Sequence, residues 1–160
     1  YVTVTVKQTS FRRQIMKITN EMKEDITLRL ANDPDSRVRA GAYSSPLMPK
    51  EKLSEMARNP KADKEEKIAV ASNPNTPPDD LDRLADDSIT WGVKEAVAKN
   101  PSVWQKTLEK LATDKHYSVR CAVISNPNVT PEIIIALSND SNLWVKKALL
   151  QAIMRDSKVE

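Results

Sequence analysis

A proline-containing pair that recurs every 26–28 residues constrains the fold of this chain more than any other feature of its sequence. The pairs are Asn73-Pro74, Asn100-Pro101 and Asn126-Pro127, and Ser45-Pro46 fills the same slot earlier in the chain. Because a residue before proline is driven out of the helical region, each pair is expected to end a helix. Self-similarity at such a period is typical of solenoids, whose units bury their apolar faces against one another.

Each unit carries aligned columns of residues. The position eight residues before the proline holds valine in four of five copies, with Glu66 as the exception. Small and apolar residues follow three and four positions later, which is the spacing of one helix face. The valine column is Val38, Val93, Val119 and, by continuation, Val145, and the basic column directly after it is Arg39, Lys67, Lys94, Arg120 and Lys146.

A second apolar column follows each proline at helical spacing, as in Leu81/Leu84 and Leu108/Leu111. Neither helix of the unit is long enough to be stable alone in water, so neighbouring units must bury their stripes. The sequence therefore predicts an all-α solenoid of about five two-helix units over residues 30–160. An acidic column, with Pro34 and Pro60 next to it, is predicted to cap the first helix of each unit. This column consists of Asp33, Asn59, Asp87, Asp114 and Asp140.

The repeat resembles the leucine-rich repeat variant family over residues 30 to about 153. The stretches that carry the resemblance are LANDPDSRVRAGAYSSP (30–46), IAVASNPNTPPDDLDRLA (68–85) and LATDKHYSVRCAVISNPNVTPEII (111–134). The resemblance implies a right-handed superhelix of alternating α- and 3₁₀-helices, similar in design to HEAT and armadillo repeats. Some members carry an iron–sulfur cluster in a cysteine-rich segment, but this chain has one cysteine, which cannot supply four ligands.

The N-terminal segment differs from the repeats. Val2, Val4 and Val6 alternate with threonines, which predicts a strand-like extension over residues 1–9. An apolar stripe from Phe11 to Leu30 predicts an amphipathic helix over residues 10–29. This helix is interpreted as a cap on the first unit, because the ends of a solenoid need covering. The alternative is a basic helix that docks on an acidic partner or phosphate backbone through Arg12, Arg13 and Lys17.

The basic column has two interpretations. As a row along one face it would bind phosphates or a protein partner. As half of an acid–base ladder with the acidic column it would be structural, and the repeat region, with 19 bases and 19 acids, favours this second interpretation. Trp91 and Trp144 lie near the start of first helices, beside lysines, where they would either anchor a partner or pack between units.

Several functions find little support in the composition. One histidine, His116, and one cysteine, Cys121, are too few for a His/Cys metal site or a catalytic triad, and two glycines leave no phosphate loop. We predict no cofactor, no metal, no small-molecule substrate and no enzymatic activity. Trp104 and Asp114 are the only candidates for a site like that of HEAT-like alkylpurine DNA glycosylases. No apolar run approaches the length of a membrane span, and we expect no membrane partner and a cytoplasmic location.

The predicted function is thus a non-enzymatic repeat scaffold that binds a protein or peptide. Solenoids offer extended surfaces and little buried catalytic geometry. The alternative is nucleic-acid binding through the basic column and the basic N-terminal helix.

Overall fold

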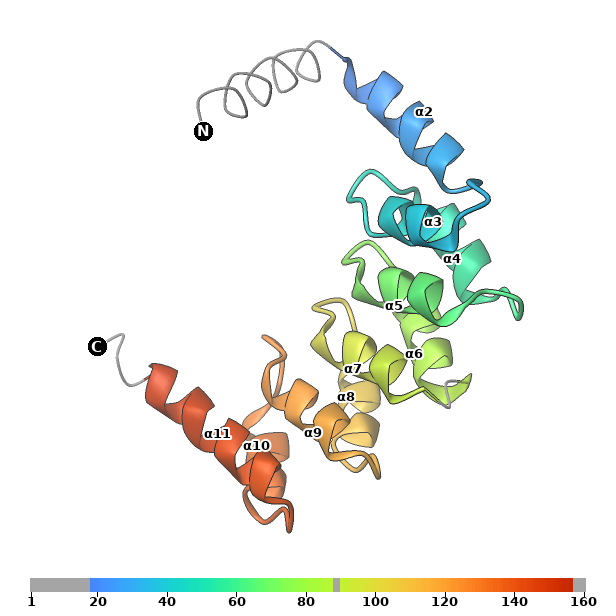
Figure 1. The fold of residues 1–160 in the computed structure, drawn as a ribbon. Coiled ribbons are helices and arrows are strands. Elements are labelled where there is room, and N and C mark those ends of the chain that lie inside the picture. The colour runs from blue at the N-terminus through green and yellow to red at the C-terminus, as the bar shows by residue number, and fades with distance from the viewer. Residues whose placement is uncertain (1–17, 88–89, 157–160) are drawn as a thin grey trace, which may run out of the picture.

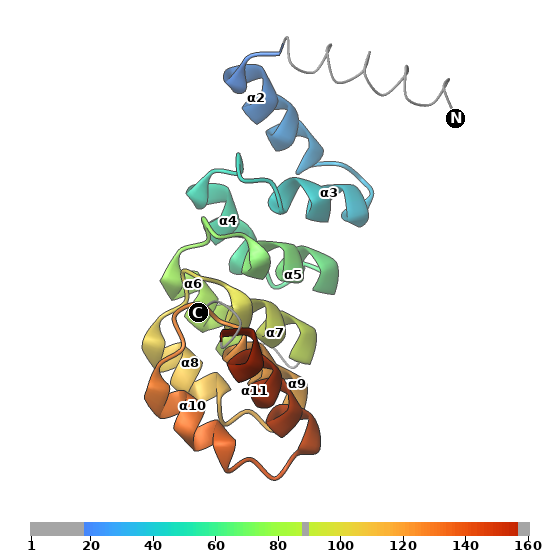
Figure 2. The ribbon, with the colours of Figure 1, turned by 90° about the vertical axis from the view of Figure 1, so that its left-hand side faces the viewer.

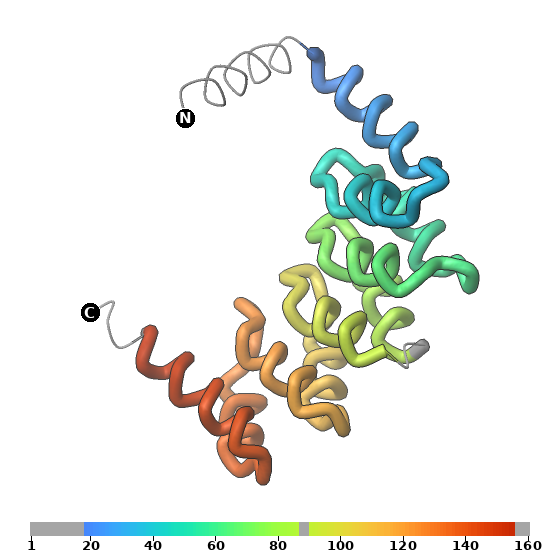
Figure 3. Tube along the Cα trace, viewed as in Figure 1, coloured from blue at the N-terminus to red at the C-terminus, as the bar shows by residue number. Residues whose placement is uncertain are grey.

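The computed structural model describes residues 18–87 and 90–156, where the chain forms ten α-helices and no strand. They form two layers (Figure 2) that stack into an arc with α2 and α11 at its ends (Figures 1 and 3). The first layer contains α3 (Ser36–Tyr43), α5 (Lys64–Ser72), α7 (Trp91–Lys99), α9 (Tyr117–Ile124) and α11 (Leu143–Asp156). The second contains α2 (Asn20–Leu30), α4 (Lys50–Ala57), α6 (Pro78–Asp87), α8 (Gln105–Leu111) and α10 (Pro131–Ser138).

The all-helical repeat architecture predicted from the sequence is confirmed. Each unit is a first-layer helix, a turn at the proline pair and a second-layer helix, and consecutive first-layer helices pack side by side. The second helices of the units, α4, α6, α8 and α10, are α-helices of 7–10 residues. The 3₁₀-helices that the resemblance implies are therefore absent from residues 18–87 and 90–156.

The core runs along the stack between the two layers. Val93, Val119 and Val145 are at most 1% exposed, because each lies on the side of its helix that faces the rest of the stack. Alanines at the next inward position, such as Ala96 and Ala122, keep adjacent first-layer helices close together. From α7 to α11 the valine column therefore lies within one continuous core.

The first-layer helices begin later than the sequence predicts. Their N-caps are Asp35, Asp63, Thr90 and His116 for α3, α5, α7 and α9, and the Asn142 side chain caps α11. The predicted caps Asp33 and Asn59 are wrong by two and four residues, and Pro34 and Pro60 precede the helices. Four members of the acidic column instead accept the backbone N–H two residues ahead, an Asx-turn that shapes the approach to the helix. These four are Asp33, Asn59, Asp114 and Asp140.

The asparagines of the Asn-Pro pairs join consecutive units. The Asn100 amide nitrogen donates to the backbone oxygens of Ala71 at 2.7 Å and Asn73 at 2.8 Å, both in the preceding unit. Its side-chain oxygen accepts the N–H of Ser102 at 2.8 Å. Asn73 and Asn126 make the same three contacts in their own units, and all three side chains are buried.

We call this series of contacts by Asn73, Asn100 and Asn126 the asparagine ladder. The sequence pattern did not reveal this second role of the Asn-Pro pair. The first copy has Ser45 in the slot, where no described unit precedes it, and the Ser45 hydroxyl oxygen accepts the N–H of Leu47. A further hydrogen bond lies two residues after each of these asparagines. Its donors are the side chains of Asn75, Ser102 and Asn128, and its acceptor is the carbonyl oxygen of the preceding copy's proline. Each turn is thus hydrogen-bonded to the turn before it.

Helix α2 does not match the predicted capping helix. It begins at Asn20, capped by Thr19 in an extended conformation, rather than near residue 10. It rests on the first unit through buried Thr27 and half-buried Leu28. The apolar stripe of Met22, Ile26 and Leu30 is exposed instead. The expected strand-like extension, and the N-terminal half of the predicted helix, lie outside the described residues.

Candidate functional site

Arg120 connects two consecutive units at the start of the first-layer helices. Its Nε and Nη2 atoms donate to the Asp140 carboxylate at 2.6 and 2.9 Å, and Nη1 donates to the backbone oxygen of Asp114 at 2.7 Å. Hydrogen bonds from this guanidinium hold the pKa of Asp140 below its usual range, against the opposing effect of burial. Arg120 thus fixes the turn of its own unit and the turn of the next.

Lys94 repeats this contact one unit earlier, with its Nζ atom 2.8 Å from the Asp114 carboxylate. Burial raises the pKa of Asp114, but the hydrogen bonds from Lys94 and the His116 N–H outweigh it and leave this pKa lowered. In both pairs the acid follows the base by 20 residues.

In the first unit, the basic-column residue Arg39 pairs with an acid outside the acidic column. Asn59 stands 20 residues after Arg39, the spacing of the two later pairs, and offers no charge. The Arg39 Nε atom instead lies 2.5 Å from the carboxylate of Glu66, the one acid in the valine column. Glu66 is buried, and it also completes a capping box with Asp63 at the start of α5. The two exceptions to the columns, Asn59 and Glu66, therefore compensate for each other.

The remaining members of the two columns form no such pair among the described side chains. Among the described side chains, Lys67 and Lys146 have no ion-pair partner. The Asp33 carboxylate forms its turn and has no ion pair with a described base, although Arg39 donates to the Asp33 backbone oxygen at 2.8 Å. The Asp87 side chain, Arg12 and Arg13 lie outside the described residues. Three of the five basic side chains are consequently neutralised inside the stack.

Exposed aromatic rings form a row along the same edge of the first layer. The rings of Trp91 and His116 stack with centroids 5.0 Å apart and planes 5° from parallel, and Tyr117 continues the stack at 5.3 Å from His116. The Lys64 Nζ atom lies 5.9 Å from the Trp91 ring. Trp91 is 49% exposed and Tyr117 41%, so the row faces solvent.

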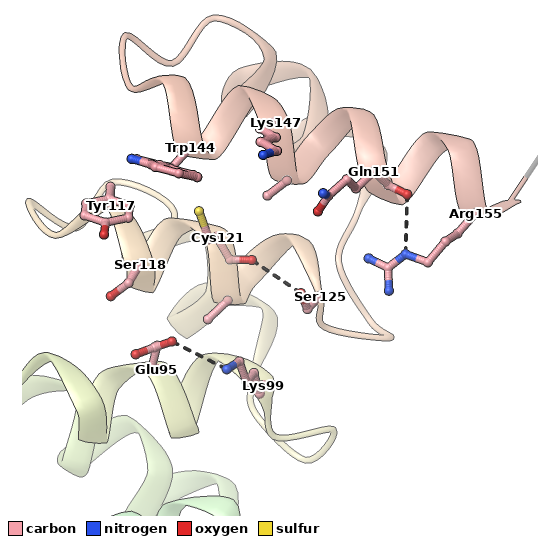
Figure 4. Close-up of a pocket in the computed structure, with 12 residues that line it drawn as sticks. Glu95, Lys99, Tyr117, Ser118, Cys121, Ser125, Trp144, Lys147, Gln151 and Arg155 are labelled. Atoms are coloured by element: carbon pink, nitrogen blue, oxygen red, sulfur yellow. Dashed lines mark hydrogen bonds and ion pairs between the residues drawn. The ribbon is translucent and has the colours of Figure 1, made fainter.

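The row ends in a groove of about 480 Å³ between α7, α9 and α11. Figure 4 shows Trp144 projecting from the start of α11 toward Tyr117 and Cys121 on α9. Lys147 places its Nζ atom 5.3 Å from the Trp144 ring, and Trp144 remains 57% exposed. The charged residues that line the groove are Lys99, Lys147, Arg155 and Glu95.

The groove therefore combines large apolar rings with an excess of positive charge. Glu95 lies 3.5 Å from Lys99 and offsets part of that charge, which leaves Lys147 and Arg155 without an ion-pair partner among the described residues. Burial raises the pKa of the Cys121 thiol, so this residue acts as an apolar part of the groove floor.

Comparison with known proteins identifies one unit of the stack. Residues 65–89 match the family model described as Leucine rich repeat variant. The α5–α6 unit is a leucine-rich repeat variant. Neither a curated protein nor a solved structure shows a significant match to the chain.

The leucine-rich repeat variant unit contains a copy of nearly every column described above. Within residues 65–89 lie Glu66, Lys67, the ladder residue Asn73 and the apolar pair Leu81/Leu84. The α7–α8 and α9–α10 units repeat the same geometry with the same contacts. In the described part of the chain, none of these helices is both long and apolar enough to cross a membrane.

The two candidates for an enzymatic site, Trp104 and Asp114, lie at opposite ends of α8. Trp104 precedes α8 and Asp114 follows it, so α8 separates them by about 10 Å. Asp114 is also engaged by Lys94. Residues 18–87 and 90–156 hold no group of three or more side chains suited to bind a metal ion.

Sequence reasoning identified Trp91 and Trp144 but missed the residues between them. His116, Tyr117 and Cys121 belong to the intervening unit, and Lys99 and Arg155 come from the far ends of α7 and α11. The available signal was the first residue of the first-layer helices, which is aromatic in two consecutive units, Trp91 and Tyr117.

Proposed function

We propose that the chain is a non-enzymatic repeat scaffold that binds a protein partner in the groove between α9 and α11. The partner segment presents a large apolar side chain to Trp144 and Tyr117 and carboxylates to Lys147 and Arg155. The single observation that carries this proposal is the exposure of Trp144, which is half uncovered at the mouth of a groove lined by bases.

Exposed tryptophan and tyrosine are the side chains that most often dominate protein interfaces. Their rings bring a large contact area at a low cost in conformational entropy. Here the rings are already ordered by neighbours, since His116 stacks on Trp91 and Lys147 lies against Trp144. A preorganised surface of this kind loses little freedom when a partner binds.

Charge favours an acidic peptide over a nucleic acid. A phosphate backbone needs a regular row of free bases, but Arg39, Lys94 and Arg120 are engaged in ion pairs between units. Lys67 and Lys146, which have no ion-pair partner among the described side chains, are three units apart, or about 30 Å at ordinary helix spacing. Nucleic-acid binding is therefore treated as an alternative outcome of the test below.

The test selects short random peptides displayed on phage against the full chain and then measures the enriched peptides by fluorescence anisotropy. We expect enriched sequences to combine aspartate or glutamate with a large apolar residue. Trp144→Ala and Lys147→Glu should each weaken their binding by about tenfold or more, because losing a central interface residue costs about 2 kcal/mol or more and tenfold corresponds to about 1.4 kcal/mol.

Matched controls separate the groove from the rest of the surface. Trp104→Ala removes an exposed tryptophan that also has a lysine beside it, 4.3 Å from Lys106, but lies at α8. Lys50→Glu reverses an exposed charge on α4. Both should leave peptide affinity within about twofold. Peptides that bind Trp144→Ala as tightly as the original chain, or a poly-uridine RNA that binds more tightly than any peptide, would contradict the proposal.

A further inference from the structure

The two ends of the stack expose the columns that interior units bury. Val38 is 37% exposed, whereas Val93, Val119 and Val145 in the same column are at most 1% exposed. At the other end Leu150 is 62% exposed, whereas the equivalent Ile124 is 6% exposed. In the interior these columns are covered by the adjacent unit, so both ends present a unit-to-unit contact surface that no described unit covers.

The α2–α3 end carries acidic residues among its apolar ones. Leu30 is 42% exposed although Leu84, Leu111 and Leu137 in its column are buried. Together with Met22 and Ile26 it forms an outward stripe on α2. Exposed acids flank this stripe, namely Glu21, Glu24 and Asp25, and Asp25 is paired with the exposed Arg29.

The exposed charged side chains described on the α11 end are basic. The helix continues past the point where other units end, because Ala152-Ile153 replaces the Asn-Pro pair. Leu150, Ile153 and Met154 are exposed along it, and the exposed charges interspersed with them are basic, Lys146 and Arg155. Solenoids that end in solvent generally need a polar outer face, and both described ends expose large apolar side chains among their charged ones.

Each end also carries one half of the base–acid pair that joins consecutive interior units. Lys146 has the position of Lys94 and Arg120 but no carboxylate partner within residues 18–87 and 90–156. Asp33 has the position of Asp114 and Asp140 and forms the same Asx-turn, but its carboxylate forms no ion pair with a described base, since Arg39 donates to its backbone oxygen instead. The missing partner of each half is the group that the other end offers.

We propose that the α11 end of one molecule docks on the α2–α3 end of a second copy of this chain, in the register of the repeats. Lys146 then pairs with Asp33 of the second copy as Arg120 pairs with Asp140. Leu150 and Val38 take up positions equivalent to the buried Ile124 and Val145. The contact joins two different surfaces, so it is heterologous and adds copies head to tail, into a filament or a closed ring.

Sedimentation velocity over a concentration series tests this proposal with a pair of charge reversals. The unmodified chain should form larger species as its concentration rises. The Lys146→Glu variant brings two carboxylates together at the contact, and the Asp33→Lys variant brings two ammonium groups together. Each variant alone should therefore associate at least about tenfold more weakly than the unmodified chain. In an equimolar mixture, the glutamate of the first variant meets the lysine of the second, so association should return.

The mixture is the decisive sample, because a variant that merely unfolds is not rescued by another variant. Circular dichroism checks that each variant is folded, and Lys50→Glu, which reverses a charge away from both ends, should associate like the original chain. A chain that stays monomeric at every concentration overturns the proposal, as would result from its own residues 1–17 covering the α2–α3 end. Failure of the mixture to associate would overturn it equally. Neither result bears on peptide binding in the groove.

Discussion

Asn100→Asp is expected to lower the free energy of unfolding by about 2–5 kcal/mol. The Asn100 side chain is 2% exposed, and its two N–H groups donate to the carbonyl oxygens of Ala71 and Asn73 in the preceding unit. Aspartate keeps the shape but removes both donors and brings a negative oxygen against two buried carbonyl oxygens. A buried group that loses its partner costs about 1–3 kcal/mol, and here two acceptors and a charge are affected.

Urea unfolding followed by circular dichroism measures this loss. Asn139→Asp is the matched control, because Asn139 is exposed and its amide nitrogen makes only a long 3.5 Å contact with the Ile135 oxygen. That variant should stay within about 0.5 kcal/mol of the original chain. A loss of less than about 1 kcal/mol for Asn100→Asp would mean that the asparagine ladder does not hold the units together.

Glu66→Val should destabilise the chain by about 1–3 kcal/mol, although it restores the valine of the other copies. The change removes the carboxylate that pairs with Arg39 and half of the capping box with Asp63. Arg39 is 25% exposed, so water compensates for part of the loss. The effect comes from the lost partner of Arg39 and not from the size of the new side chain.

Adding Asn59→Asp to Glu66→Val should recover at least half of that loss. It supplies a carboxylate 20 residues after Arg39, the spacing at which Lys94 meets Asp114 and Arg120 meets Asp140. Asn59→Asp alone should change stability by no more than about 0.5 kcal/mol. A double variant that is as unstable as Glu66→Val would show that the two exceptions are unrelated substitutions.

The repeat was predictable because its columns are defined by spacing alone. The valine column and the apolar pairs stand at a fixed number of residues from the proline of each unit. Residues at the same offset lie on the same face of the stack. Helix starts were less predictable, since aspartate or asparagine two residues before a cap resembles the cap itself. Asp33 and Asp35 both have the right chemistry, and only the backbone decides which of them caps α3.

The predicted orientation of α2 was wrong for a different reason. An amphipathic stripe such as Met22, Ile26 and Leu30 indicates that a face will be buried but does not identify what covers it. The asparagine ladder was missed because proline alone accounts for the helix end. The choice of asparagine before it in three copies, where many residues would serve, was the signal that the side chain has its own partners.

The groove could be predicted only in part. Trp91 and Trp144 stood out because they are rare residues near the starts of first-layer helices. Their relation to Tyr117, Lys99 and Arg155 depends on how far each helix is displaced from the next, and no single-unit pattern contains that displacement. The basic column was visible in the sequence, but three of its five members turned out to be engaged between units.

Exchange of the asparagine side-chain amide protons with deuterium, followed by NMR, tests most directly whether each unit is held by its neighbour. The Asn73, Asn100 and Asn126 amides should exchange as slowly as the backbone N–H groups of the buried core around Val97, because each donates to two carbonyl oxygens of the preceding unit. Exchange at the rate of the exposed Asn139 amide for all three would contradict the stacked arrangement.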